Sequence, residues 1–338
     1  MGIRYLGSKA RVIDAIAQLI GKPVAKAERF IDAFSGTGVV ASAAADLGWN
    51  VHINDHMRCA RLLSTARMLA KSDVPFSEFG GYSGAIDRLN KAEPASGFLW
   101  REYSPASSKR APRPRQYFTE KNAAQMDGVR DLIREWRTAR TITIKEEGLL
   151  LADLLEAASA IANTAGTFGC FLSGWSSTAL RPFRLRARSL RAKPVLFTEG
   201  ELDVFSVSAD LKDTVYLDPP YTKRQYAAYY HVLETLAHGD EPKVSGVTGL
   251  RPWRDKASLF CYKRHALPSM LKLIRGIRAN RVLISYSTEG HIDLEELTRG
   301  LREYGTVETH QISKIPRYQP TGSTQKYVDE FVVEFQRE

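Results

Sequence analysis

Apolar residues follow two patterns along most of the chain, short continuous runs and runs with helical spacing. The short runs predict strands at residues 29–34, 49–55, 194–198, 214–217 and 281–286. Apolar residues spaced three and four apart predict helices at residues 12–20, 39–47, 57–71, 226–236, 270–279 and 294–304. Strands that alternate with helices are typical of an α/β fold with a mostly parallel sheet.

The C-terminal part departs from this alternation. Two apolar runs, at residues 306–312 and 327–335, are separated only by a loop at 316–326. That loop is too short to hold the crossover helix that two parallel strands would require. We therefore expect an antiparallel hairpin that closes the sheet at its C-terminal end.

The alternation also stops between residues 72 and 193, which carry no convincing parallel strand. This stretch holds a loop rich in Pro, Ser and Arg at 104–115 and two helical patterns, at 120–140 and 146–163. The second pattern has an apolar stripe that we expect in the core, formed by Leu149, Leu150, Leu154, Leu155 and Ala158. The stretch is interpreted as a substrate-recognition element or as a helical cap, and these interpretations are compatible.

The domain organisation follows from this interruption. Residues 1–71 and 194–338 form one predicted α/β domain, and residues 72–193 are a helical insertion in it. The irregular loop at 239–262 contains basic and aromatic residues, and we expect it to contribute to the same recognition region.

Composition is that of an ordinary soluble globular protein, with 43% hydrophobic and 25% charged residues among 338. No apolar stretch reaches the ~18 residues that a membrane span needs, and Met1–Tyr5 lack the apolar core of a secretory signal. We therefore expect a cytoplasmic protein with no membrane partner. Cys59, Cys170 and Cys261 lie far apart, which predicts reduced thiols and neither a disulfide framework nor a metal site.

Positive charge is concentrated in two stretches. The net charge is +10, and residues 101–115 and 181–193 together carry a net charge of the same size. Clusters of one sign with interleaved aromatic residues indicate a polyanionic partner. The arginines that are candidates for contact with such a partner are Arg110, Arg113, Arg115, Arg181, Arg184, Arg186, Arg188, Arg224 and Arg251.

The first predicted strand runs directly into Ser35-Gly36-Thr37-Gly38 and then into a helix. A glycine turn at a helix N-terminus lets the backbone approach a nucleotide closely. Asp55 ends the next strand about 20 residues later, where such folds place a ribose-binding carboxylate. With Ala41 the turn also fits a permissive dinucleotide pattern, but Asp32 would repel a pyrophosphate and could instead receive the ammonium of an amino-acid group.

The strand at 214–217 ends in Asp218-Pro219-Pro220-Tyr221. Proline fixes its own φ and has no N–H, so the neighbouring carbonyls and the Asp218 carboxylate form a rigid set of acceptors. Beside them stands the aromatic face of Tyr221. These groups suit a planar amine, although a lone Pro-Pro pair would more simply be read as a turn.

The order of these motifs resembles the D12 class of DNA adenine N6-methyltransferases, the group that includes the Dam methylases. The resemblance covers nearly the whole chain and rests on Tyr5-x-Gly-Ser-Lys9, Asp32-Ala-Phe34-Ser-Gly36-Thr-Gly38, Asp55 and Asp218-Pro-Pro-Tyr221. It implies a Rossmann-like fold that binds S-adenosylmethionine. It also makes residues 72–193 the target-recognition region.

The resemblance assigns roles to individual residues. The cofactor-binding residues that it and the motifs imply are Tyr5, Lys9, Asp32, Phe34, Ser35, Gly36, Gly38, Asp55, Asp203 and Asp218. Asp203 is the weaker match, near the cofactor adenine. The implied catalytic residues are Asp218, Pro219, Pro220 and Tyr221.

The implied function is site-specific methylation of N6 of a flipped-out adenine in double-stranded DNA. The enzyme would be an orphan methylase or one paired with a cognate restriction endonuclease, and would use no metal. An RNA adenine-N6 or DNA cytosine-N4 methyltransferase shares the same amine chemistry. From other classes, a non-catalytic nucleic-acid-binding protein and a nicotinamide-dependent reductase are the alternatives. Intact Asp218 and Tyr221 speak against the first, and the lack of a hydride-relay pair speaks against the second.

Overall fold

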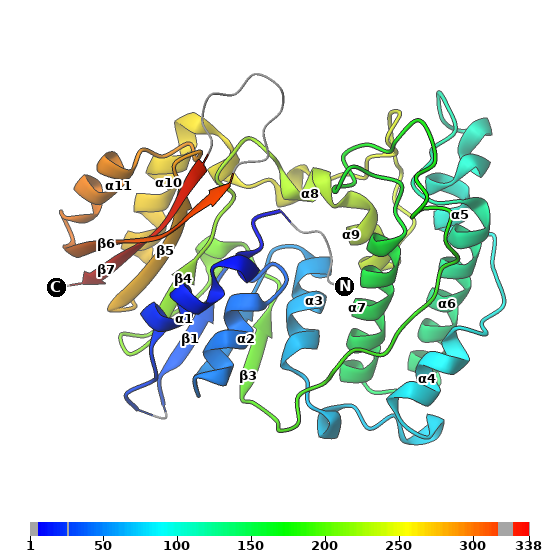
Figure 1. The fold of residues 1–338 in the computed structure, drawn as a ribbon, viewed down its shortest axis with the longest axis horizontal. Helices are drawn as coiled ribbons and strands as arrows, with labels where there is room; N and C mark the ends of the chain where they lie inside the picture. Colours follow the sequence, from blue (N-terminus) through cyan, green and yellow to red (C-terminus); the bar gives the residue numbers. More distant parts are fainter. Residues whose placement is uncertain (1–5, 26, 317–326, 338) are drawn as a thin grey trace. The chain divides into compact units, whose positions relative to one another are not determined.

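The computed structural model describes residues 6–25, 27–316 and 327–337 (Figure 1). The chain forms two compact units. The helical unit comprises Leu6, Met57–Val195 and Tyr226–Lys256. The sheet unit comprises Gly7–His56, Leu196–Gln225 and the residues from Ala257 onward.

The sheet unit is built on a seven-stranded sheet of order β3-β2-β1-β4-β5-β7-β6. Its strands are β1 (Arg29–Asp32), β2 (Asn50–Asn54), β3 (Phe197–Gly200), β4 (Thr214–Leu217), β5 (Arg281–Ser287), β6 (Gly305–Pro316) and β7 (Tyr327–Arg337). The first five are parallel, whereas β7 is antiparallel to both β5 and β6. The predicted α/β fold with a closing C-terminal hairpin is confirmed.

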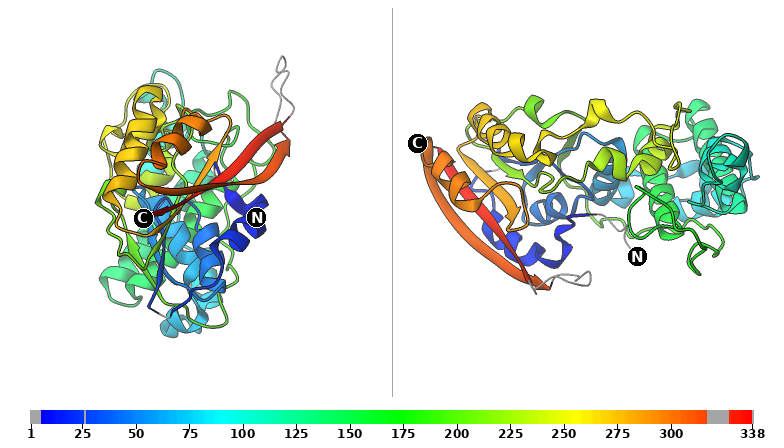
Figure 2. Two further views of the ribbon diagram at one scale, coloured as in Figure 1. Left: turned by 90° about the vertical axis from the view of Figure 1, so that its left-hand side faces the viewer. Right: turned by 90° about the horizontal axis from the view of Figure 1, so that it is seen from above.

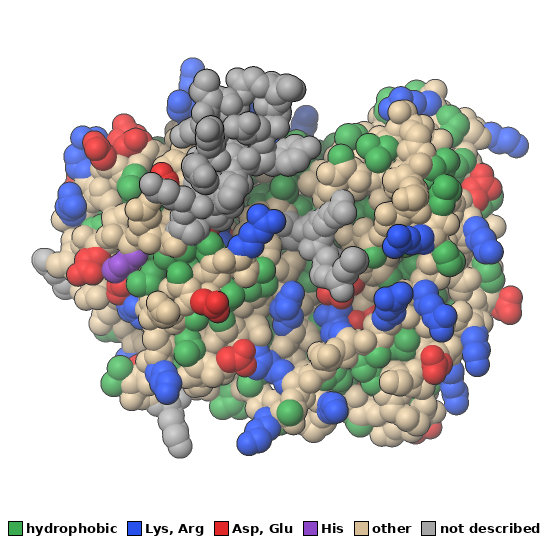
Figure 3. Space-filling view, viewed as in Figure 1, with side chains coloured by type: hydrophobic (Ala, Val, Ile, Leu, Met, Phe, Trp, Pro, Cys, Tyr) green, Lys and Arg blue, Asp and Glu red, His purple; other side chains and the backbone are tan. Residues whose placement is uncertain are grey.

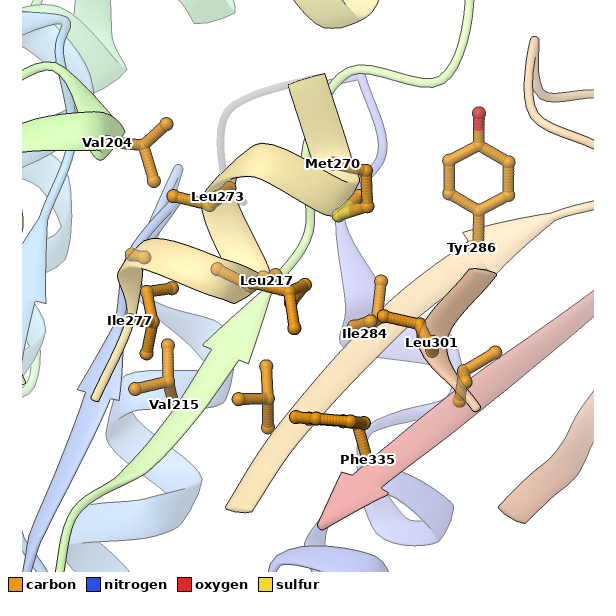
Figure 4. Packing of buried hydrophobic residues seen from close by; sticks show 14 of the residues in the cluster. Val204, Val215, Leu217, Met270, Leu273, Ile277, Ile284, Tyr286, Leu301 and Phe335 are labelled. Carbon is orange, nitrogen blue, oxygen red and sulfur yellow. The ribbon is translucent and has the colours of Figure 1, made fainter. Parts of the chain in front are cut away.

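Helices cover both faces of this sheet (Figure 2). They are α1 (Ile13–Ile20) and α2 (Val39–Asp46) on one face, and α10 (Lys263–Gly276) and α11 (Leu294–Leu301) on the other. Figure 4 shows how α10 packs on the sheet, with Met270, Leu273 and Ile277 above Val215 and Leu217 of β4. This layer is buried and forms the hydrophobic core on one face of the sheet.

The strand register sets the position of the polar groups at one edge. Asp32 at the end of β1 pairs with Ile53 of β2 and Tyr216 of β4. Successive parallel strands therefore present their carboxyl ends at this edge. Because β7 runs in the opposite direction, it contributes its first residues instead, and Glu330 pairs with Ser287 at the end of β5.

The helical unit contains no named strand in the part of the chain that the structure describes, as predicted for residues 72–193. Its helices are α3 (Arg58–Met68), α4 (Tyr82–Leu89), α5 (Phe98–Tyr103), α6 (Glu120–Thr138), α7 (Ile144–Ala160), α8 (Tyr226–Tyr229) and α9 (His231–His238). The predicted leucine stripe on α7 is fully buried. The unit is wider than the predicted insertion, since 57–71 and 226–256 belong to it.

Element boundaries differ from the predictions at a few points. Helix α10 begins at Lys263 and contains Pro268, whereas the helix was predicted only from Met270. Burial of Ala266 and Met270 against the sheet stabilises the helix across the proline, which removes only one backbone donor. Strand β3 lies at 197–200 rather than 194–198 because its register follows β2.

Two simpler expectations can be compared with the structure. Cys59, Cys170 and Cys261 are reduced cysteines, each outside any disulfide. Among the described residues, no helix combines the length and the apolar character that crossing a bilayer requires.

Candidate active site

The Asp218 carboxylate lies at the centre of the site, directly after β4. Its Oδ1 accepts a hydrogen bond from the Tyr221 hydroxyl and lies 3.2 Å from Nζ of Lys9. The Lys9 ammonium also donates to the Tyr221 hydroxyl oxygen. With only 3% of its side chain exposed, Lys9 is a buried cation held by these groups. The structure therefore brings together three residues that are up to 212 positions apart.

Two acceptors next to this cluster have no hydrogen-bond donor among the described residues. Neither Oδ2 of Asp218 nor the carbonyl oxygen of Pro219 accepts a hydrogen bond from any described residue. Both belong to the Asp218–Tyr221 segment, whose prolines limit backbone motion.

Burial dominates the protonation of this cluster. It raises the pKa of Asp218, and the charge of Lys9 and the hydrogen bond from Tyr221 oppose that rise. It also raises the pKa of Tyr221 well above the usual range, and the neighbouring Asp218 adds to this. Tyr221 is consequently a stable proton donor, and Lys9 is what keeps a buried Asp218 available as an anion.

Glu330 is a residue of this cluster that sequence reasoning missed. It comes from β7, and its Oε2 lies 3.6 Å from Nζ of Lys9. Burial raises the pKa of Glu330, whereas the Lys9 charge lowers it. The only signal in the sequence is a pair of neighbouring acids, Asp329 and Glu330, near the start of the strand, and the antiparallel direction of that strand brings Glu330 to this edge of the sheet.

The glycine turn follows β1 as predicted. Gly36 and Gly38 have φ values of 52° and 75°, in the left-handed region that favours glycine. The N–H of Gly38 donates to the Ser35 carbonyl at 2.7 Å, and the N–H of Gly36 donates to Oδ2 of Asp55 at 2.9 Å. Asp55 therefore lies against the turn, at the end of β2, where the sequence placed a ribose-binding acid.

Asp32 is a buried carboxylate in which one of the two oxygens lacks a hydrogen-bond donor among the described residues. Its Oδ2 accepts from the N–H of Ala41 at 3.1 Å, while Oδ1 is buried and has no hydrogen-bond partner among the described residues. Burial raises the pKa of Asp32 well above the usual range, and the negative charge of Asp218 contributes. A buried acceptor without a partner is costly unless a ligand donates to it.

A row of aromatic rings lies beside the turn. Phe34 meets Phe260 edge-on with a centroid distance of 5.7 Å, and Phe260 stacks on Phe205 at 6.1 Å with an interplanar angle of 5°. Asp203 accepts from the N–H of Phe205 at 2.9 Å and is half exposed. These rings and the acid are suited to binding a flat heterocycle with an amino group.

Asn54 is a second positioning residue that the sequence did not reveal. Its side chain is buried at the end of β2, donates to the carbonyls of Ala33 and Leu202, and accepts from the N–H of Leu202. It therefore ties the turn after β1 to the segment that carries Asp203. Its only signal was its place at a strand end.

The candidate DNA-binding arginines fall into two groups. In the space-filling view, Lys and Arg side chains gather over the helical unit (Figure 3). The exposed candidates are Arg110, Arg113, Arg181, Arg184, Arg186 and Arg224. Of these, Arg113 lies over the Phe171 ring at 5.1 Å.

Three other arginines are used inside the protein. Arg115 is 2% exposed, and its guanidinium donates to Glu102 and to the carbonyls of Gly246 and Val247. Arg188 pairs with Asp153 at 2.7 Å. Arg251 pairs with Asp240 at 2.8 Å. Burial withholds the Arg115 guanidinium from solvent, and it anchors the loop at 246–247, which does not favour the predicted contact with DNA.

Two further sequence predictions concern Tyr5 and a metal ion. Tyr5 lies outside the described residues. Among residues 6–25, 27–316 and 327–337, no cluster of three or more His, Cys, Asp or Glu could hold a metal ion.

Comparison with known families adds to this geometry. The family model described as D12 class N6 adenine-specific DNA methyltransferase matches residues 5–298. The chain belongs to this family. The match includes every motif from Lys9 to Tyr221, whereas Glu330 lies beyond it.

Curated relatives agree with this membership. The type II methyltransferase M.FokI of Planomicrobium okeanokoites is 34% identical over 93% of this chain and 49% of its own length. The modification methylase StsI of Streptococcus sanguinis is 32% identical over 99% of this chain and 52% of its own length. The type II methyltransferase M.NlaIII of Neisseria lactamica is 30% identical over 91% of this chain and 90% of its own length. The chain thus spans about half the length of the first two relatives.

Proposed function

We propose that this chain transfers a methyl group from S-adenosylmethionine to N6 of a flipped-out adenine in double-stranded DNA. The observation that carries the proposal is a pair of acceptors, Oδ2 of Asp218 and the Pro219 carbonyl, that lack a donor among the described residues and lie beside a buried Lys9. Membership of the D12 class supports adenine in DNA as the target.

The residues around the glycine turn fit the proposed cofactor. The unpartnered Oδ1 of Asp32 suits an ammonium group, and the absence of a Cβ at Gly36 and Gly38 allows close approach to the backbone. Asp55 suits ribose hydroxyls, and the ring of Phe34 and the acid of Asp203 suit the remaining parts. S-adenosylmethionine supplies a methyl group on a positively charged sulfur when it is bound.

The chain's own residues supply the rest of the chemistry. An adenine amine is a poor nucleophile because its lone pair is delocalised into the ring. Hydrogen bonds from the amine to Asp218 and Pro219 would localise that lone pair on nitrogen and stabilise the positive charge that develops there. The Asp218 carboxylate then accepts the proton that the amine loses.

Tyr221 is proposed to hold the base. Flipping an adenine out of a duplex costs a few kcal/mol of unstacking, which stacking on an aromatic ring partly offsets. The hydroxyl of Tyr221 is bound to Asp218, so the ring and the carboxylate would move together. Tyr221 would therefore align the base with the acceptors as well as stack on it.

The names of the relatives support a place in a restriction–modification system. Two of those named above are type II methyltransferases and one is a modification methylase. We extend this to the present chain as a proposal, with a cognate endonuclease as its expected partner.

The test compares the protein with its Asp218→Ala variant on unmethylated plasmid and S-adenosylmethionine. Single-molecule sequencing should find N6-methyladenine with the unaltered protein and a loss of at least ~10²-fold in the variant. Calorimetry with S-adenosylhomocysteine should show cofactor-site binding within a few-fold of the original. Marks on cytosine, or on RNA when it is offered instead, would replace the adenine-in-DNA proposal, and no marks at all would refute methyl transfer.

A further inference from the structure

The segment from Arg181 to Arg188 in the helical unit alternates between buried and exposed side chains at residues 183–186 without being a strand. Phe183 and Leu185 are buried, whereas Arg184 and Arg186 are exposed. No helix or strand is assigned to these residues. A two-residue alternation is the property of extended chain, in which successive side chains point to opposite sides.

Two asparagines hold this segment by its backbone. Asn122 of α6 accepts from the N–H of Phe183 at 2.9 Å and donates to the carbonyl of Arg181 at 2.9 Å. Asn90, at the end of α4, accepts from the N–H of Leu185 at 2.8 Å and donates to its carbonyl at 3.1 Å. Each side-chain amide thus bonds the backbone N–H and C=O groups of the segment, as the backbone of a neighbouring strand would.

The far end of the segment is fixed as well. The N–H of Arg188 donates to the Tyr82 hydroxyl, and its guanidinium pairs with Asp153 at 2.7 Å and with Glu156 at 3.5 Å. Arg188 is therefore an anchor. The segment is attached at both ends and in the middle, so the side chains between the anchors start from a fixed backbone.

The arginines between the anchors have no internal role. Arg181, Arg184 and Arg186 are exposed, and none pairs with an acid among the described residues. Two residues of extended chain span about 6.6 Å. The nucleotides of one DNA strand rise ~3.4 Å each along the axis, so neighbouring arginines of such a row can each reach a different phosphate.

We infer that Arg184 and Arg186 form a fixed row that binds the phosphates of a DNA backbone and does not read bases. The inference rests on the proposed function for DNA as the partner, and it assigns a role within that binding. Base reading in the major groove needs an element that enters the groove. The backbone of this segment is instead bonded to Asn90, at the end of α4, and to Asn122 of α6, and phosphate contacts require only exposed charge at a set position.

The first experiment measures binding of a random-sequence duplex, without cofactor, at a series of KCl concentrations. The Arg184→Gln/Arg186→Gln double variant is compared with Arg278→Gln/Arg302→Gln, which removes the same charge from exposed positions of the sheet unit. Each phosphate contact contributes about −0.9 to the slope of log K against log salt. The row variant should lose about 2 from the magnitude of the slope, and the control should keep it.

A second pair of variants tests the fixed backbone. Asn90→Ala and Asn122→Ala keep every charge but remove the bonds to the segment. Each should weaken duplex binding a few-fold at all salt concentrations with an unchanged slope, in protein whose circular dichroism shows it folded. Two variants are used because one can fail to fold. An unchanged affinity in the folded variants would overturn the role of the asparagines.

The last arm separates this inference from the proposed function. Sequencing of plasmid treated with the row variant should show the same methylated motif as the unaltered protein, at a lower rate. A changed motif would show that the row reads bases, and an unchanged salt slope would show that it does not touch phosphates. Either result overturns the inference while leaving methyl transfer intact, whereas normal duplex binding without methylation would refute only the methyltransferase proposal.

Discussion

The ammonium of Lys9 lies between two carboxylates, Asp218 at 3.2 Å and Glu330 at 3.6 Å. Each carboxylate raises the pKa of the other, because like charges disfavour ionisation. The Lys9 ammonium lowers both pKa values, because an opposite charge favours the ionised form. Asp218 must be ionised to accept amine hydrogens and the departing proton. The balance among these three residues therefore sets the pH at which the proposed reaction begins.

We predict that Lys9→Met and Glu330→Gln move the acid limb of kcat in opposite directions. Losing Lys9 leaves burial unopposed, which raises the pKa of Asp218 further and moves the limb to higher pH. Without the Glu330 charge, the Lys9 ammonium interacts with Asp218 only. This lowers the pKa of Asp218 and moves the limb to lower pH. Turnover under saturating substrate across a pH series measures both.

Glu330→Asp serves as the conservative control, because it keeps the charge and should restore most of the original profile. Shifts of Lys9→Met and Glu330→Gln in the same direction would contradict an electrostatic role for Glu330. A loss of turnover with no change in the shape of the profile would make Glu330 a packing residue only.

At the scale of elements, α9 shows how a buried polar residue supports the helical unit. Its His231 is fully buried, and Nε2 lies 3.0 Å from the carbonyl oxygen of Phe168 and 3.3 Å from the Tyr117 hydroxyl. The neighbouring Glu234 accepts from the N–H groups of Arg58 and Cys59 and so caps α3. The aromatic-rich segment at 226–236 is thus structural in this unit.

We predict that stability of the helical unit falls below about pH 6.5. Burial lowers the pKa of His231 to about 3. Between this value and the ordinary value of 6.5, the unfolded chain binds a proton at this residue and the folded protein does not. The free energy of unfolding should drop by up to ~1.4 kcal/mol for each pH unit between the unfolded and folded values. Urea unfolding followed at pH 7, 6 and 5 measures this slope.

His231→Gln should lose this slope, because glutamine does not titrate, although it should be less stable at pH 7. The exposed His265→Gln provides the matched control and should keep the slope. An equal slope in His231→Gln and the unaltered protein would assign the acid sensitivity to other groups.

At the scale of the whole molecule, the proposed functions separate by unit. The described cofactor candidates, from Lys9 to Asp218, all belong to the sheet unit. Most of the exposed arginine candidates belong to the helical unit, and Arg224 is the exception. The chain therefore has one unit suited to the cofactor and another whose surface suits a polyanion.

We predict that S-adenosylhomocysteine protects backbone amides mainly in the sheet unit. A ligand at 100 times its Kd adds about 2.7 kcal/mol to the state that binds it. Hydrogen exchange should slow at the turn around Gly36 and at the ends of β1, β2 and β4, and change little in α6 and α7. Equal protection of α6 and α7 would place the binding site differently.

Much of the fold was predictable because its signals are local. Strand lengths, helical spacing and the short loop before β7 defined the parallel sheet and its hairpin, and strand ends placed Asp32, Asp55 and Asp218 at one edge. Boundaries were less predictable where packing decides them, as at Pro268 in α10. There burial outweighs a residue that locally disfavours helix.

By itself, the sequence determined which groups are candidates for the chemistry, because motif order and strand ends are properties of the chain. Only the tertiary structure decided which charges are available. Glu330 reaches Lys9 across 321 positions, Arg115 and Arg188 are held by internal partners, and Arg184 and Arg186 stay exposed. The reason is that burial and pairing of a charge depend on neighbours distant in sequence, which no local pattern records.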